Sequence, residues 1–263
     1  MSVKHQIKTA YETLKAQSDL SPNNAAVNIN LSNLVEQLSI AREHGYEDHI
    51  VCDDTLHQER LELPFLCGEA ECEMEKYWAR HFLEKERLSP ADLTEFWYYE
   101  HYKDLWHAEQ ELMAGTDKTK RVIFLGSGAL PLTIILGAIH SPNFKAVCVD
   151  FDTEAVNLSK ALIKRLDLQE QIQVQCVYAQ EFGFKSDDFV ICASLIKDKV
   201  EVYKTFYKAG IAQFSLRDVE GCYCYLYTPS EKPLSQHYTE ILRTKPSKTC
   251  INTTRLFAKT FAH

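Results

Sequence analysis

Two glycines and an aspartate in the second half of the chain have the types and spacing of a ligand-binding turn. The segment Phe124–Pro131 (F-L-G-S-G-A-L-P) ends a short run of β-type residues and precedes an apolar helical stretch. Gly126 and Gly128 let the backbone turn sharply and approach a ligand, whose negative end the following helix start favours. Asp150 ends the next β-type run, where a carboxylate can accept hydrogen bonds from both hydroxyls of a ribose. These positions predict a nucleoside-bearing ligand; a turn that serves packing only, with Asp150 as a helix cap, is the alternative.

The third glycine position of the dinucleotide-binding motif helps to distinguish a dinucleotide from S-adenosylmethionine as the ligand. Pro131 occupies it here, and proline offers no N–H to a phosphate while its ring fills the space that glycine leaves open. S-adenosylmethionine has a ribose and an amino-acid tail but no phosphate, so it tolerates this turn. We therefore expect S-adenosylmethionine rather than a dinucleotide. The residues expected to bind it are Gly126, Ser127, Gly128, Leu132, Thr133, Asp150, Phe151, Ala179, Gln180 and Ala193.

A second group of reactive side chains lies in two segments of the first half, residues 66–75 and 96–105. Glu71 and Glu75 are four residues apart and share a helix face, where like charges cost a few tenths of a kcal/mol. Such crowding is also typical of a solvated helix. Five aromatic residues between Phe96 and Tyr102 exceed what one stripe toward a core requires, and phenols suit the wall of a pocket. The two segments predict a binding site for an amino acid.

The elements that must position these groups change character near Lys120. Before it the apolar periodicity is helical, and after it strand-like and helical runs alternate. The expected strands are 121–125, 146–149, 172–178, 189–193 and 211–216, and the expected helices between them are 132–139, 154–166 and 200–209. This alternation predicts a parallel sheet built from right-handed βαβ units. The fold class is α/β: a Rossmann-like class I S-adenosylmethionine-dependent transferase domain with an N-terminal helical domain.

The polar segment 116–119 is the expected boundary, so the predicted domains are residues 1–119, which shape the substrate site, and 120–263, which bind S-adenosylmethionine. The tail should add two antiparallel strands at the sheet edge, 238–243 and 253–260. Cys222-Tyr223-Cys224 lies in a strand-like run that would point both thiols to one face. Burial is the expected role of these thiols, with zinc binding as an alternative.

Composition excludes several classes of protein. The 263 residues carry 29 basic and 37 acidic side chains, a formal charge of −8, which disfavours nucleic acid as a partner. The N-terminus resembles no secretion signal, and the longest apolar run, around 134–139, is too short to cross a membrane. Several of the nine cysteines sit in apolar runs that predict burial. We expect a reduced, cytoplasmic protein with no membrane partner.

Three motifs in order, L-C-G-E-A-E-x-x-x-E (66–75), F-x-Y-Y-x-x-Y-x-x-L (96–105) and F-x-G-S-G-x-L-P-L-T (124–133), make the chain similar to the nicotianamine synthase family. The resemblance continues through V-D-F-D (149–152), R-D-V-E-G (217–221) and Y-L-Y-T-P (225–229). It includes the bacterial members that make opine-type metallophores such as staphylopine, pseudopaline and yersinopine.

The resemblance implies that S-adenosylmethionine donates its 3-amino-3-carboxypropyl group and leaves as 5'-methylthioadenosine. The bacterial branch implies histidine as the acceptor, a downstream opine dehydrogenase that uses the product, and a homodimer; no metal is required. On this basis we assign Glu75 as the general base, with Tyr99 or Tyr102 assisting, and Glu71, Tyr98, His101 and Arg217 as substrate-binding residues. Arg217 could pair with an α-carboxylate or form a structural ion pair, and both interpretations stay open.

Three other functions remain. A small-molecule methyltransferase shares the fold and the glycine turn, a nicotianamine synthase proper would condense several S-adenosylmethionine molecules, and a metal-binding or sensor protein would use the Cys, His and Glu residues.

Overall fold

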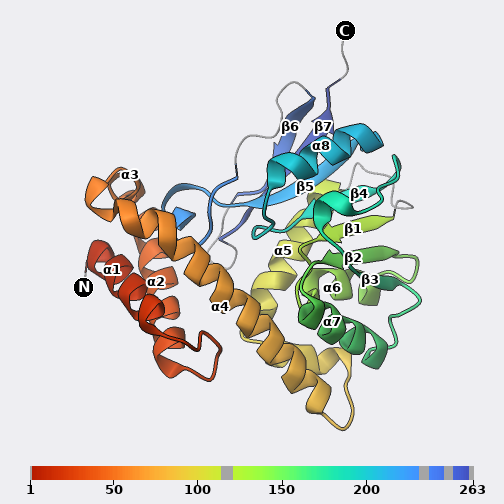
Figure 1. The fold of residues 1–263 in the computed structure, drawn as a ribbon, viewed down its shortest axis with the longest axis horizontal. Helices are drawn as coiled ribbons and strands as arrows, with labels where there is room; N and C mark the ends of the chain where they lie inside the picture. Colours follow the sequence, from red (N-terminus) through yellow and green to blue (C-terminus); the bar gives the residue numbers. More distant parts are fainter. Residues whose placement is uncertain (1, 114–120, 231–236, 246–250, 261–263) are drawn as a thin grey trace. The chain divides into compact units, whose positions relative to one another are not determined.

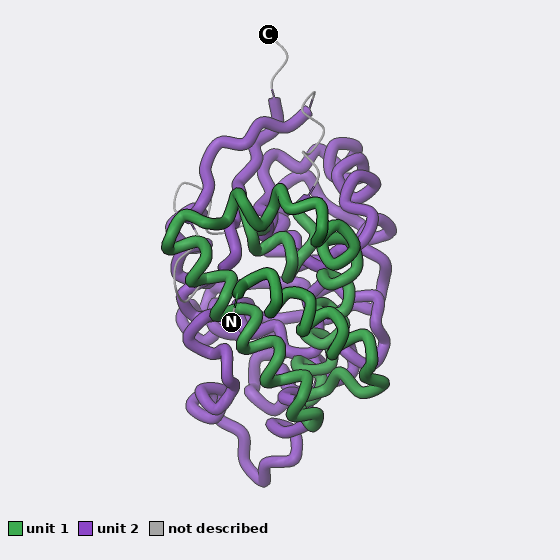
Figure 2. Tube along the Cα trace, turned by 90° about the vertical axis from the view of Figure 1, so that its left-hand side faces the viewer, with its two compact units in different colours: residues 1–77, 219–229 green, residues 78–218, 230–263 purple. Residues whose placement is uncertain are grey.

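The computed structural model describes residues 2–113, 121–230, 237–245 and 251–260. These residues form two compact units, coloured separately in Figure 2. Unit 1 contains residues 1–77 and 219–229, and unit 2 contains residues 78–218 and 230–263. The chain therefore leaves unit 2 after the fifth strand, contributes a short segment to unit 1, and returns.

Unit 1 is helical within its described residues. Its elements are α1 (Val3–Ala16), α2 (Ala25–Glu43), α3 (Glu47–Val51), the 3₁₀ helix η1 (Asp54–Leu56), the first part of α4 (His57–Glu84) and the 3₁₀ helix η5 (Gly221–Tyr225). Side chains cap the first two helices, because Ser2 accepts from the His5 N–H and Asn24 from the Ala26 N–H. Leu34 and Leu38 of α2 are fully buried.

The segment η5 corrects a prediction. Cys222, Tyr223 and Cys224 were expected in a strand, but they form a 3₁₀ turn that is buried in unit 1. Its geometry follows from tertiary contacts: the Tyr225 hydroxyl donates to the Ile50 carbonyl oxygen at 3.0 Å, and the Cys222 thiol to the Leu38 carbonyl oxygen at 3.3 Å. The two thiols therefore serve packing and hydrogen bonding in the helical unit.

Unit 2 is built on a seven-stranded sheet with the order β3-β2-β1-β4-β5-β7-β6. The strands are β1 (Val122–Leu125), β2 (Ala146–Asp150), β3 (Ile172–Cys176), β4 (Phe189–Cys192), β5 (Gln213–Asp218), β6 (Tyr238–Arg243) and β7 (Thr253–Lys259). The first five pair in parallel, and β7 and β6 are added antiparallel beyond β5. The predicted parallel sheet with two antiparallel tail strands is confirmed.

The remaining elements of unit 2 are the end of α4, η2 (Pro90–Glu95), α5 (Tyr99–Leu112), α6 (Leu132–His140), α7 (Thr153–Arg165), η4 (Ala179–Glu181) and α8 (Lys199–Ala209) (Figure 1). Ser89 precedes η2, and both its N–H and its hydroxyl donate to Oδ2 of Asp92, at 2.8 and 2.6 Å. Asp152 caps α7 by accepting from the Glu154 and Ala155 N–H groups.

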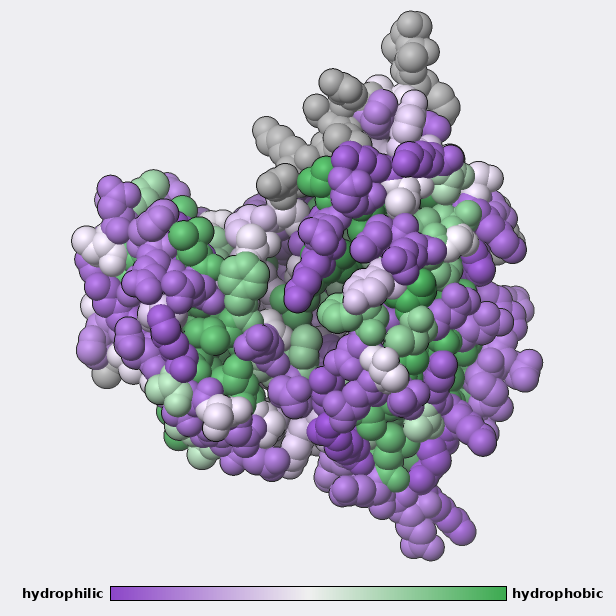
Figure 3. Space-filling view, viewed as in Figure 1, coloured by the Kyte–Doolittle hydropathy of each residue, from purple (hydrophilic) through white to green (hydrophobic). Residues whose placement is uncertain are grey.

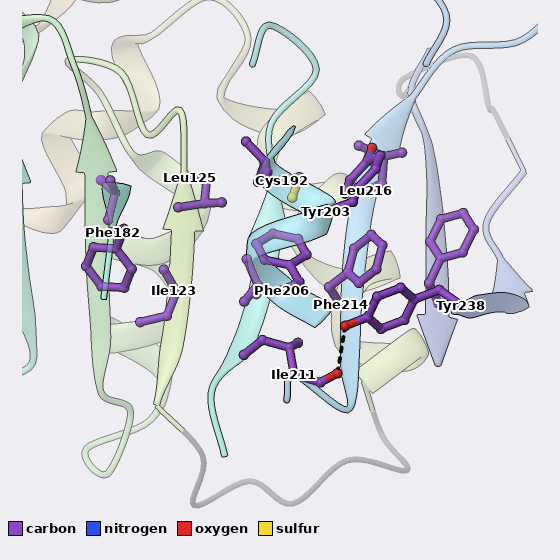
Figure 4. Close-up of a cluster of buried hydrophobic side chains, with 14 of the residues drawn as sticks. Ile123, Leu125, Phe182, Cys192, Tyr203, Phe206, Ile211, Phe214, Leu216 and Tyr238 are labelled. Carbon is purple, nitrogen blue, oxygen red and sulfur yellow. Dashed lines mark hydrogen bonds between the residues drawn. The ribbon is translucent and has the colours of Figure 1, made fainter. Parts of the chain in front are cut away.

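Buried hydrophobic side chains fill the space between the sheet and α8 (Figure 4). Phe206 of α8 and Phe214 of β5 place their ring centroids 5.1 Å apart, and Tyr203 stacks on Phe214 at 5.3 Å. The Tyr238 hydroxyl at the sheet edge donates to the Ile211 carbonyl oxygen at 2.9 Å. This core fixes α8, and with it the side chains at the start of that helix, against β4 and β5.

The predicted boundary between residues 119 and 120 lies outside the described residues. The two units also divide the chain differently from the two predicted domains, because residues 78–113 pack with the sheet. Arg165 of α7 illustrates this packing: its guanidinium donates to the carbonyl oxygens of Leu83 in the last turn of α4 and of Lys85 and Glu86 just after that helix.

On the face shown in Figure 3, hydrophilic side chains surround smaller groups of hydrophobic ones. Among the exposed hydrophobic side chains of unit 1 are Leu61 and Phe65 of α4. None of the helices that the structure describes is long and apolar enough to span a membrane.

Candidate active site

The glycine turn lies at the carboxyl end of β1 and is bound to the end of β2. The N–H groups of Gly126 and Ser127 both donate to the Val149 carbonyl oxygen, at 2.8 and 3.1 Å. Gly126 and Gly128 have φ values of +68° and +65°, in the left-handed region that favours glycine. A Cβ on Gly126 would lie 2.9 Å from Cγ1 of Ile196. Both the backbone geometry and this close approach therefore require glycine at position 126.

Asp150 is held directly beside that turn. One oxygen of its carboxylate accepts from the Gly128 N–H at 2.8 Å and the other from the Asp152 N–H at 2.9 Å. Burial raises the pKa of Asp150, and these backbone hydrogen bonds oppose that rise. Each oxygen keeps acceptor capacity beyond its one N–H partner. The structure thus brings together the three residues on which the ligand prediction depends.

Phe151 adds an exposed aromatic surface next to Asp150. Its ring is stacked on that of Tyr178, with centroids 5.6 Å apart and planes within 7°. Both side chains are more than half exposed, and Lys197 places Nζ 5.9 Å from the Phe151 centroid. The predicted residues Ala179 and Gln180 follow Tyr178 in η4. Two parallel, exposed rings at the carboxyl ends of β2 and β3 offer a platform for a planar group such as a base.

The other predicted residues of the turn have buried side chains. Ser127, Leu132 and Thr133 are each at most 2% exposed, and the Thr133 hydroxyl accepts from Nη2 of Arg217 at 2.8 Å. Ala193, after β4, lies against Gly126. These side chains support the turn from within, so the half-buried backbone of Gly126 and Gly128 is the part that a ligand can approach.

Arg217 of β5 takes part in a buried ion pair. Its Nε and Nη2 donate to the two oxygens of Glu109 on α5, at 2.7 and 2.9 Å. Arg217 is 5% exposed, Glu109 is 2% exposed, and the guanidinium carbon lies 4.7 Å from the Phe124 ring centroid. Of the two interpretations that the sequence left open, the structure shows the ion pair; sequence reasoning did not identify Glu109.

The predicted aromatic wall forms one connected cluster in unit 2. Phe96 has ring contacts with Tyr98 and Tyr102, with centroids 6.0 and 5.7 Å apart, and Tyr98 contacts His101 at 5.4 Å. Tyr99 begins α5, and Tyr102 lies one turn later. Burial lowers the pKa of His101, which favours the neutral imidazole.

The two predicted acidic residues belong to a different unit from the aromatic cluster. Glu71 and Glu75 are half-buried on α4 within unit 1, four residues apart as expected. The Glu71 carboxylate adds to the effect of burial in raising the pKa of the Cys67 thiol. The convergence of Glu75 with Tyr99 and Tyr102 stays a prediction. No group of His, Cys, Asp or Glu suited to holding a metal ion is found among the residues whose placement is described.

Comparisons with known proteins agree on one family. The family model described as "Nicotianamine synthase protein" matches residues 2–262. Nicotianamine synthase 2 of Arabidopsis thaliana is 28% identical over 238 residues, which cover 84% of this chain and 72% of the plant protein. L-histidine 2-aminobutanoyltransferase of Yersinia pestis is 28% identical over 148 residues, 56% of this chain and 52% of that protein.

Solved structures give the same fold. The crystal structure of a variant of MtNAS in complex with S-adenosylmethionine superposes with a TM-score of 0.82, at 20% identity and 97% coverage of both chains. MtNAS in complex with MTA and tNA gives a TM-score of 0.82 at 20% identity, covering 98% of this chain and 97% of that one. The predicted Rossmann-like fold with an N-terminal helical region is thereby confirmed.

Proposed function

Because this chain belongs to the nicotianamine synthase family, we propose that it is an S-adenosylmethionine-dependent aminocarboxypropyl transferase whose acceptor is the amine of histidine. The reaction moves the 3-amino-3-carboxypropyl group to the acceptor nitrogen and releases 5'-methylthioadenosine. The observation that carries the proposal is the turn of Gly126 and Gly128 hydrogen-bonded to Asp150, in a chain that matches the family over residues 2–262.

The residues of that turn fit the adenosine end of S-adenosylmethionine. The carboxylate of Asp150 retains acceptor capacity for ribose hydroxyls, and the exposed Phe151 and Tyr178 rings suit an adenine. When bound, the sulfonium of S-adenosylmethionine supplies three electrophilic carbons. The residues around it select among them by orientation, because an in-line approach at about 3–3.5 Å decides which carbon reacts.

The acceptor amine has to be neutral, since an ammonium has no lone pair with which to attack. We assign this task to Glu75, with Tyr99 or Tyr102 assisting, and a positioned general base of this kind is worth roughly 10²–10⁴ in rate. Glu71, Tyr98 and His101 are assigned to the acceptor. The partly desolvated His101 has a lowered pKa and offers a neutral imidazole for a hydrogen bond to the acceptor.

Two groups of relatives favour different acceptors. The L-histidine 2-aminobutanoyltransferases of Yersinia pestis and Pseudomonas aeruginosa support histidine, the latter at 31% identity over 90 residues. The plant nicotianamine synthases match a larger share of the chain and favour the second candidate, condensation of several S-adenosylmethionine molecules. A homodimer and a downstream opine dehydrogenase complete the proposal.

Mass spectrometry of the products distinguishes these functions. Purified protein incubated with S-adenosylmethionine and L- or D-histidine should release methylthioadenosine and an aminobutyryl-histidine. Turnover that is unchanged when histidine is omitted would indicate nicotianamine synthesis. S-adenosylhomocysteine together with a methylated product would identify a methyltransferase and refute the proposal.

A further inference from the structure

A cluster of polar side chains lies at the carboxyl ends of β4 and β5, on the face of the sheet that α8 covers, and the reaction described above gives it no role. Lys199 begins α8, and its Nζ donates to the Ser194 carbonyl oxygen at 2.7 Å. The side chain is half-buried, and across the described parts of the chain no carboxylate lies within ion-pair distance of it. A partly desolvated ammonium without a counter-ion is unfavourable in a folded protein unless a ligand supplies the negative charge.

Two buried hydroxyls on the same face of the sheet lack hydrogen-bond partners within the described residues. Tyr203 lies one turn further along α8, is 1% exposed, and has no partner for its hydroxyl. Thr253 of β7 is 0% exposed and likewise has no partner for Oγ1. It pairs in register with Asp218, so its side chain lies on the same face of the sheet as that residue. Buried hydroxyls are normally hydrogen-bonded, so two exceptions in one place call for an explanation.

This cluster is connected to the glycine turn. The segment between β4 and α8 carries Ala193 and Ile196, which lie against Gly126, and it also supplies the Ser194 carbonyl that holds Lys199. In sheets of this type, ligands bind outside the carboxyl ends of the parallel strands. Lys199 therefore stands at the ligand-binding edge, one short segment away from the turn that we assign to S-adenosylmethionine.

The charges of the cluster indicate what it would bind. Arg255 donates to the Asp218 carboxylate at 2.8 Å and also pairs with Glu240, while Asp218 acts on Lys199 only from beyond ion-pair distance, so the charge of Lys199 is only partly balanced. Burial raises the pKa of Tyr203, which keeps its phenol protonated and able to donate, and burial lowers the pKa of Lys199. One positive charge and two hydroxyl donors match a singly charged carboxylate better than a doubly charged phosphate.

We propose that Lys199, Tyr203 and Thr253 form a subsite for the α-carboxylate of an amino acid. This inference rests on the proposed function. The proposed reaction offers two such groups: the carboxylate of the acceptor, and the carboxylate on the methionine end of S-adenosylmethionine. The subsite would hold one of them and so orient the carbon chain to which it is attached.

Two matched pairs of ligands test the subsite by calorimetric titration. S-adenosylmethionine is compared with methylthioadenosine, which lacks the sulfonium charge and the aminocarboxypropyl group with its carboxylate, and histidine is compared with histamine, which lacks only the carboxylate, on enzyme saturated with methylthioadenosine. The test variant is Lys199→Met. The control is Lys208→Met, which removes an exposed lysine from the same helix. Tyr203→Phe removes only the hydroxyl and keeps the ring that stacks on Phe214.

In the wild type, the carboxylate-bearing ligand should bind more tightly in at least one pair. Lys199→Met should reduce that preference by about ten- to a hundredfold, the value of a charge-assisted hydrogen bond, and Tyr203→Phe should reduce it less. A loss in the first pair assigns the subsite to S-adenosylmethionine, and a loss in the second assigns it to the acceptor. Unchanged preferences in both pairs, with intact thermal melts, would overturn the subsite while methylthioadenosine release still supports the function. Wild-type protein that binds neither S-adenosylmethionine nor histidine would overturn both.

Discussion

The carboxylate of Asp150 combines two roles at the scale of a single residue, because it holds the glycine turn and is assigned to the ribose. Asp150→Ala removes an ionised acceptor, so S-adenosylmethionine affinity should fall by about ten- to a hundredfold, equivalent to roughly 1.5–3 kcal/mol. Calorimetric titration measures this. Asp152→Ala is the matched control, because that carboxylate caps α7 and its loss should lower stability by about 1 kcal/mol with cofactor affinity retained. Equal losses in both variants would contradict the assignment.

The pH dependence of cofactor binding follows from the same carboxylate. Burial raises the pKa of Asp150 above its ordinary 3.8, so in acid the folded protein takes up this proton earlier than a free aspartate does. A protonated carboxyl is a poorer acceptor for two ribose hydroxyls. Affinity for S-adenosylmethionine should therefore fall as the pH drops through the raised pKa, at a pH above 3.8. A titration of affinity against pH that stays flat down to 3.8 would show that ionised Asp150 is not the acceptor.

Glu75→Gln tests the assignment of the base. The amide cannot accept a proton from the acceptor amine, so transfer should slow by roughly 10²–10⁴ while S-adenosylmethionine affinity stays unchanged. Methylthioadenosine release under saturating substrates provides the rate. Glu69→Gln removes an exposed carboxylate from another face of α4 and should leave turnover unchanged. If turnover survives in Glu75→Gln, Glu71 or a tyrosine takes the role instead.

At the scale of elements, two ion pairs lie at opposite ends of the parallel strands of unit 2. Arg217 and Glu109 are both buried near the carboxyl end of β5, whereas Arg121 and Asp188 pair at 2.8 Å before β1 and β4, with Arg121 about a third exposed. Arg217→Met leaves Glu109 buried without its counter-ion and should lower the free energy of unfolding by about 3–5 kcal/mol.

Comparing the free energies of unfolding of Arg121→Met and Arg217→Met shows how much the burial of an ion pair adds to the cost of breaking it. Arg121→Met should cost less than Arg217→Met, because solvent reaches the Arg121 guanidinium and the Lys185 N–H still donates to the buried Asp188 carboxylate. Adding Glu109→Leu to Arg217→Met removes the orphaned charge and should recover much of the loss. Urea denaturation monitored by circular dichroism gives these free energies. A double variant no more stable than Arg217→Met would contradict this account.

Most elements of unit 2 could be predicted because their signals are local. The strands at β1, β2 and β4 are short apolar runs between helical stretches, and Gly126, Gly128 and Asp150 mark the turn by residue type alone. Residues defined by distant partners could not be predicted. Glu109 looks like any acidic residue of an exposed helix, and only Arg217, far along the chain, explains its burial.

The same reason accounts for the error at η5 and for the residues missed in the site. The alternation of Cys222, Tyr223 and Cys224 is typical of a strand, but hydrogen bonds to α2 and α3 impose a 3₁₀ turn. Tyr178 offered a usable signal, an aromatic residue at the end of the predicted third strand. Lys199 and Tyr203 are four residues apart on an otherwise ordinary helix, and only the sheet beneath them shows that they share a polar cluster with Thr253.

At the scale of the whole molecule, the two units are interleaved in sequence, which no composition shift near residue 120 reveals. Unit 1 is completed by residues 219–229, inserted between β5 and the tail strands. The anchor of that insertion is Tyr225, which is 0% exposed and donates to the Ile50 carbonyl oxygen. The contacts that complete unit 1 are therefore made by a segment that follows β5 in the chain.

This interleaving predicts which amides exchange together in the intact chain. Tyr225→Ala removes a buried ring from unit 1, a loss of about 3–5 kcal/mol, and should accelerate hydrogen exchange in α2 and α3. The strands β1 and β2 lie in the other unit and should keep their protection. Tyr225→Phe retains the ring and removes only the hydroxyl, so its effect on α3 should be smaller. Hydrogen exchange followed by mass spectrometry resolves these segments, and equal acceleration in β1 and α3 would show that the two units open as one.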